Sequence, residues 1–150
     1  MPADFTINFG KLTDRLKAAI PAMHAEVAKE LYQFAEEVMK DSKEVVPVLT
    51  GALMNTGKVQ PPKDENGMIS VTLGYGDEAV GYALYVHEAL EGARAPNPNW
   101  SWAKAAAKGH PIKWTRPGSG PKFLSRPLQA KQDQLPGRVQ AGIMRALKSV

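Results

Sequence analysis

The chain has no cysteine among its 150 residues, so disulfides, thiolate metal sites and thiol nucleophiles are all excluded. No apolar run approaches the ~20 residues that a membrane-spanning helix needs, and we expect no membrane partner. Acidic residues are scarce in the last part of the chain, where residues 92–150 hold 11 Lys and Arg but a single acid, Asp133. The excess of Lys and Arg over acids in residues 92–150 indicates a surface that can contact other macromolecules.

The charge of the chain is divided between its two parts. Residues 1–91 hold 8 Lys and Arg against 14 Asp and Glu, a net charge of −6, whereas residues 92–150 carry +10. A surface of one sign attracts partners of the other sign. The partner of the basic part is either nucleic acid or the acidic part of an identical neighbour in a head-to-tail ring. A solvated basic surface without any partner is the third interpretation.

The clearest pattern in the sequence is one long amphipathic helix over residues 22–43. Its apolar residues are spaced by four, four, three and four, as on one face of a helix: Met23, Val27, Leu31, Phe34 and Val38. Before it we expect a short strand over residues 5–9 and a short helix over residues 11–19. Pro21 then acts either as a first-turn residue of a new helix or as a kink.

A small antiparallel sheet is expected after the long helix. A short strand over residues 58–60 is followed by an Asn66-Gly67 turn, because left-handed dihedrals cost little at these residues. Residues 69–75 then alternate between apolar and polar, which predicts a strand with one buried face. Residues 82–87 are interpreted as a further strand.

The remaining chain is interpreted as a long loop and a closing helix. The loop, residues 92–121, holds five prolines and all three tryptophans. In the final helix Ser125 is expected to be the N-cap and Pro127 a first-turn residue, with a break or kink at Pro136-Gly137. Its apolar stripe comprises Leu128, Leu135, Val139, Ile143 and Leu147.

These elements predict the α+β class in a single domain, residues 1–150. Within it we distinguish three parts, an acidic helix-plus-sheet part (1–91), a long basic loop rich in Trp and Pro (92–121), and a C-terminal helix (122–150). A chain of this length is expected to bury about 70% of its unfolded surface in one core.

No pattern in the sequence indicates catalysis. His87 and Glu88 begin a stretch like a zinc-protease helix, but the second histidine is replaced by Glu91. Ser119 and Ser125 have no His and Asp partners in a recognisable arrangement. We therefore expect no catalytic residue, no metal, no cofactor and no enzymatic activity.

One group of residues in and beside the loop interleaves aromatic rings with cations. It comprises Arg94, Trp100, Trp102, Lys104, Lys108, Lys113, Trp114 and Arg116. Such a group is suited to single-stranded nucleic acid, whose bases stack and whose phosphates pair. It is equally suited to a protein interface, where Trp and Arg are common buried anchors. The alternative is local packing of the loop onto the sheet, above all by Trp114.

Three short segments at the junctions of predicted elements carry a resemblance to a known family. They are VPVLTGAL at 46–53, YALYVHE at 82–88 and GPKFLSRPL at 120–128. In this order the chain resembles a family of small proteins of long-tailed bacteriophages, described as minor tail, tail-completion or neck proteins that join head and tail. The resemblance spans most of the chain but excludes residues 92–121.

The resemblance implies a structural virion protein that forms a homo-oligomeric ring, typically of six copies, in the neck. Its partners would be a head-side connector or stopper ring and the tail terminator or tail tube. Genomic DNA would pass through the lumen without sequence specificity. The protein would lie in the virion, and in the host cytoplasm during assembly. The alternatives are another ring position, such as tail terminator or head-completion stopper, and a nucleic-acid-binding protein that acts through its basic C-terminal region.

Two tryptophan replacements separate the interface from the packing interpretation. If Trp100 or Trp114 anchors a partner, its replacement by Ala should abolish assembly while the melting temperature of the monomer hardly moves. If it packs the core, the same replacement should cost about 3–5 kcal/mol of stability. Sedimentation and thermal unfolding of the two variants distinguish these outcomes.

Overall fold

The longest element is helix α1, Gly10–Val45, in a computed structural model that describes residues 10–48, 51–77, 83–88 and 116–149. The predicted apolar stripe is buried toward the end of the helix, where Phe34 is 5% and Val38 0% exposed, and half-buried at Met23, Val27 and Leu31. The expected division into two helices at Pro21 is wrong, because Pro21 lies inside α1. Proline removes one helical hydrogen bond, and since Pro21 and Lys17 are both exposed, water can satisfy the carbonyl that is left free.

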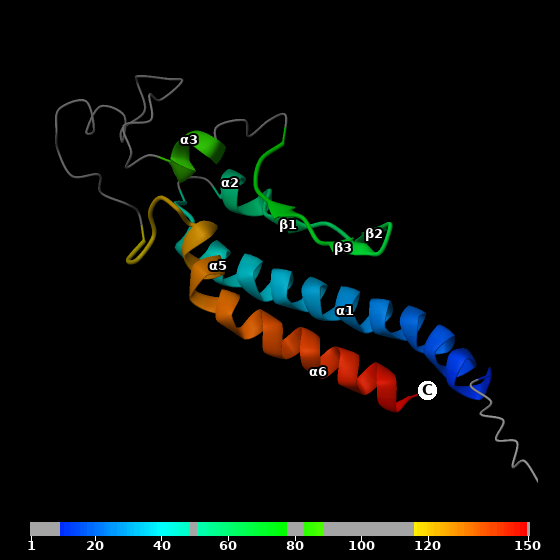
Figure 1. Cartoon of the computed structure of the whole chain (residues 1–150). Coiled ribbons are helices and arrows are strands. Elements are labelled where there is room, and N and C mark those ends of the chain that lie inside the picture. Colours follow the sequence, from blue (N-terminus) through cyan, green and yellow to red (C-terminus); the bar gives the residue numbers. More distant parts are fainter. Residues whose placement is uncertain (1–9, 49–50, 78–82, 89–115, 150) are drawn as a thin grey trace, which may run out of the picture.

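The C-terminal part is helical and runs antiparallel to α1 (Figure 1). It consists of α5 (Ser125–Lys131), a 3₁₀ turn η1 (Gln132–Gln134) and α6 (Leu135–Lys148). Two expectations need correction here. The N-cap is Leu124 and not Ser125, and the break precedes Pro136, which lies in the first turn of α6. A proline is tolerated there because the first N–H groups of a helix have no intrahelical partner.

The strands lie on the other side of α1 from α6, so that α1 forms the middle layer (Figure 1). β1 (Lys58–Val59) pairs antiparallel with β4 (Leu73–Gly74), and β2 (Lys63–Glu65) pairs antiparallel with β3 (Met68–Ser70). The turn between β2 and β3 is the predicted one, with positive φ at Asn66 and Gly67. The α+β class is therefore confirmed.

The predicted single strand over residues 69–75 is divided into β3 and β4. The register places Lys63 opposite Ser70 and Val59 opposite Leu73, so the gap in the ladder falls beside Pro61 and Pro62. Proline has no N–H to donate to a neighbouring strand. The interruption thus comes from the partner strand, and not from residues 69–75 themselves.

The predicted strand over residues 82–87 is wrong, since residues Ala83–His87 form helix α3. Leu84 is 66% exposed and Val86 only 6%, which is expected of residues two apart on a helix and not of residues on one face of a strand. The Glu88 N–H donates to the Leu84 carbonyl in helical fashion, at 3.0 Å. Packing of Val86 against the core outweighs the β propensity of this segment.

Two sequence expectations fall outside the described residues. They are the strand over residues 5–9 and the main part of the loop, residues 92–115. No helix in the described ranges has the length and apolar character that would let it cross a membrane.

Gly142 of α6 allows the two long helices to approach closely. A Cβ built on Gly142 would lie 3.2 Å from Glu30 Cγ and 3.5 Å from the Glu26 carbonyl oxygen, whereas one on Gly137 meets nothing within 4 Å. We expect Gly142→Leu to destabilise the protein by about 1–3 kcal/mol through overpacking. The matched Gly137→Leu should gain up to about 0.8 kcal/mol of helix propensity. Urea unfolding of both variants checks the contrast, and equal effects would contradict it.

Candidate functional site

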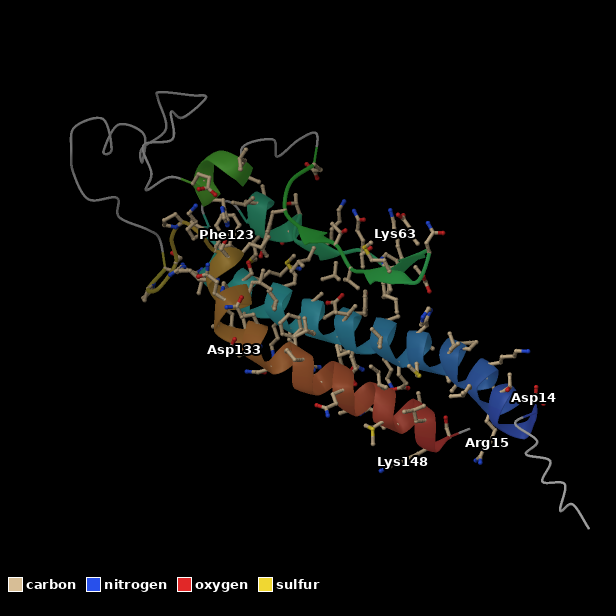
Figure 2. All side chains as sticks on the ribbon, in the orientation of Figure 1. Asp14, Arg15, Lys63, Phe123, Asp133 and Lys148 are labelled. Carbon is tan, nitrogen blue, oxygen red and sulfur yellow. The ribbon has the colours of Figure 1, made fainter. Side chains whose placement is uncertain are left out.

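The three segments that carry the family resemblance meet at one end of α1. Val46, Leu53, Val86 and Phe123 form one buried cluster, which we call the junction cluster. Figure 2 labels Phe123 at this place, between α1, α2 (Ala52–Asn55) and α3. Phe123 is 1% exposed and Val46 is not exposed at all. Segments far apart in the sequence therefore share a single packing unit.

Backbone hydrogen bonds join the third segment to the last residues of α3 and α1. The Lys122 N–H donates to the His87 carbonyl at 2.8 Å, and the Gly120 N–H donates to the Val45 carbonyl at 3.1 Å. Lys122 adopts a positive φ of 55°, which is uncommon for a residue other than glycine. The chain thus turns sharply at Lys122 and presents Phe123 to the cluster.

Two rings contact the Phe123 ring edge to face. The Tyr75 centroid lies at 5.1 Å and the His87 centroid at 5.0 Å, with interplanar angles of 89° and 82°. Such geometries are favourable beyond the apolar area that they bury. The Tyr75 hydroxyl donates to Ser42 Oγ at 2.9 Å. Burial raises the pKa of Tyr75, although its hydrogen bond with Ser42 acts in the opposite direction.

Beside the cluster lies a polar group made of His87, Glu88, Lys122 and Ser125. His87 Nδ1 lies 2.7 Å from Glu88 Oε1, and His87 Nε2 lies 3.2 Å from Ser125 Oγ. Lys122 Nζ forms an ion pair with the other oxygen of Glu88. The expectation that Ser125 has no histidine and acid partner is therefore wrong. The sequence could not indicate this, because 38 positions separate Ser125 from His87.

The main electrostatic feature lies between α1 and the C-terminal helices. Glu30, 8% exposed, accepts hydrogen bonds from both Arg138 and Arg145. The other ion pairs across the same seam join Arg145 with Glu26, Arg138 with Glu37, and Lys131 with both Glu37 and Asp41. These pairs fix the register of α6 against α1.

The two arginines determine the charge state of Glu30. Burial raises the pKa of the Glu30 carboxyl, but the hydrogen bonds and positive charges of Arg145 and Arg138 outweigh burial, and the pKa lies below its usual value. Conversely, the pKa of Arg145 is raised by its hydrogen bonds to Glu30 and Glu26. Glu30 and the two arginines are therefore charged at neutral pH.

This seam changes the interpretation of the divided charge. One interpretation of the sequence was that acidic and basic parts meet between neighbouring copies. In the structure, acids of α1 and three cations of α5 and α6, namely Lys131, Arg138 and Arg145, pair within one chain. Part of the complementary charge is therefore used internally and is not available to nucleic acid or to a neighbour.

Of the candidate interface residues, only Arg116 is described. Its NH2 group donates to the Lys43 and Val46 carbonyls, both at 2.8 Å, so it satisfies carbonyls at the C-terminal end of α1. It also lines an open hollow of about 440 Å³ along α1. The others lie outside the described residues, namely Arg94, Trp100, Trp102, Lys104, Lys108, Lys113 and Trp114.

The described ranges contain no group of three or more His, Cys, Asp or Glu side chains that could hold a metal ion. The chain matches no protein family model, no curated protein and no solved structure.

Glu30→Gln should reveal the seam as a pH-dependent contribution to stability. The wild-type contribution is complete above the ordinary carboxyl pKa and is lost as the pH falls through the lowered pKa of Glu30. We therefore expect the variant to be less stable at neutral pH by about 1.5–3 kcal/mol, the usual worth of hydrogen bonds to charged groups. The difference should vanish in acid.

Urea unfolding across the acid range measures this difference, with Glu44→Gln as the control. Glu44 is exposed on the same helix, so its replacement should change stability by less than about 0.5 kcal/mol at any pH. A Glu30→Gln variant whose deficit persists unchanged in acid would contradict the assignment.

Proposed function

We propose that this protein is a structural virion component of a long-tailed phage. It would assemble where head and tail join as a ring, typically of six copies in the family that it resembles. The proposal rests on the resemblance carried by the three segments, and the junction cluster supports it by making those segments one packing unit. The observation that carries self-association is an apolar face on the two long helices.

That face follows from the register of α1 against α6. Glu26 faces α6, and Val27 comes one residue later, rotated by about 100°. On α6 the buried residues are Gly142 and Ala146. Ile143 and Leu147 come directly after them. In two antiparallel helices, a residue that comes one position after a contact residue is turned toward the same side of the pair, whichever helix it belongs to. All of these apolar residues therefore point to one side of the hairpin.

This open face comprises Ile20, Val27, Val139, Ile143 and Leu147. None of its residues is fully buried, and Ile20 and Leu147 are 54% and 45% exposed. The same stripe of α1 is closed toward the junction cluster, where Val38 is 0% exposed. Toward the other end Leu16 continues the exposed surface at 56%, and Figure 2 places Asp14 and Arg15 beyond the end of α6 at Lys148.

An apolar face of two helices is the kind of surface that mediates protein association. A helix pair reaches a stable arrangement when this face is covered by another layer. A second copy of the chain is the cover that a ring requires, and the same contact repeated with rotation closes the ring. Charge on the rim would direct approach and register, and the apolar residues would supply the affinity.

The test is a change of charge on the open face. Ile20→Lys combined with Leu147→Lys should shift sedimentation of the protein from concentration-dependent oligomers to monomers, because both changes would bury an unpaired charge. Met68→Lys is the matched control, since Met68 is 73% exposed on β3 and is not part of the open face. Both variants should keep the melting temperature of the wild-type monomer.

Two results would contradict the proposal. One is a wild-type protein that stays monomeric at every concentration, alone and with its head-side and tail-side partners. The other is a purified phage particle that lacks this polypeptide by mass spectrometry. Cryo-electron imaging of the particle would distinguish the neck ring from the terminator and stopper positions.

A further inference from the structure

The side chains of Ser125, His87 and Glu88 stand in the order of a serine nucleophile, its base and an orienting acid. Ser125 Oγ lies 3.2 Å from His87 Nε2, and His87 Nδ1 lies 2.7 Å from Glu88 Oε1. Both distances are within reach of a hydrogen bond. The three groups come from two elements, α3 with the residue that follows it, and the first residue of α5.

The charge state of Glu88 determines which nitrogen of His87 carries the proton. The hydrogen bonds from Lys122 and then from His87 lower the pKa of the Glu88 carboxyl, so the group is ionised at neutral pH. An ionised carboxylate only accepts hydrogen bonds. In neutral His87 the proton is therefore on Nδ1, and the lone pair of Nε2 faces the Ser125 hydroxyl, as a general base requires.

The surroundings hold this arrangement in place and leave it reachable. The Phe123 ring contacts the His87 ring, and the Lys122 N–H is bonded to the His87 carbonyl. The residue that makes this bond has the uncommon φ of 55°, and such backbone outliers are concentrated at functional sites. The His87 side chain keeps 17% of its surface exposed, and Ser125 is half-buried, so a small reagent can reach both.

We propose that Ser125 is an activated nucleophile that accepts an acyl group from a carboxylic ester, with His87 as its general base and Glu88 as a positioning residue. Ser125 Oγ attacks the ester carbonyl carbon while its proton passes to His87 Nε2. The bond from that carbon to the alcohol oxygen breaks, and the departing alcohol takes the proton from His87. Water, deprotonated by His87 Nε2, then attacks the carbonyl carbon of the acyl-serine. The bond from that carbon to Ser125 Oγ breaks, His87 returns the proton to Ser125 Oγ, and the carboxylic acid is released.

A fluorophosphonate probe tests this chemistry, because it phosphonylates an activated serine irreversibly and releases fluoride. Peptide mass spectrometry of the full-length protein is expected to find the label on Ser125. Ser125→Ala should abolish labelling, and His87→Gln should slow it at least ~100-fold, the lower range for loss of a general base. Ser70→Ala is the control, since Ser70 is exposed on β3, and it should label like the wild type.

The positioning role of Glu88 has its own readout. Glu88→Gln should lower the maximal labelling rate. The probe concentration that gives half of the maximal rate should stay the same, and so should the melting temperature. Ser125→Ala removes a single hydroxyl, so it remains informative if the His87 variant fails to fold. The proposal is overturned if the wild type takes up no probe, or if Ser125→Ala is labelled as fast as the wild type. Labelling of the monomer is independent of ring assembly, so the two proposals can fail separately.

Discussion

The position of Glu30 between Arg138 and Arg145 is the interaction on which the rest of the structure depends. A carboxylate that is 8% exposed needs its partners, because an unpaired charge in such a place is strongly unfavourable. Only one register of α6 against α1 supplies both guanidinium groups, and Gly142 lets the helices come close enough for it. The pair of helices is thereby fixed in rotation as well as in position.

That register has consequences at one end of the helix pair and along the rest of its length. At one end it directs α5 back toward the junction cluster, where Phe123 packs against Tyr75 and His87. Along the rest of α1 and α6, each apolar residue that comes directly after a residue in the helix contact lies on the same side of the pair. The ion pairs therefore create the open face, although they are no part of it. The open face and the polar group at Ser125 are therefore both positioned by the ion pairs of Glu30 with Arg138 and Arg145.

Sequence patterns were informative where they depend on local structure. The stripe of α1 and the Asn66-Gly67 turn could be predicted, since each is determined by neighbours within a few residues. Helix α3 could not, because contacts of Val86 with residues distant in sequence override its β propensity. The Ser125–His87 contact has no sequence pattern at all. The seam did have one, the seven-residue spacing of Lys131, Arg138 and Arg145, which places three cations on one helical face.

The two consecutive prolines at positions 61 and 62 bear on how the strands are kept from pairing with strands of other molecules. Two-stranded ribbons with open edges invite pairing with strands of other molecules, and proline on an edge strand is a known protection against such pairing. Here the prolines cut the ladder into stretches of two and three residue pairs, too short to act as a template. Strand-to-strand pairing between molecules is therefore disfavoured. Any contact between copies would be made by the helices.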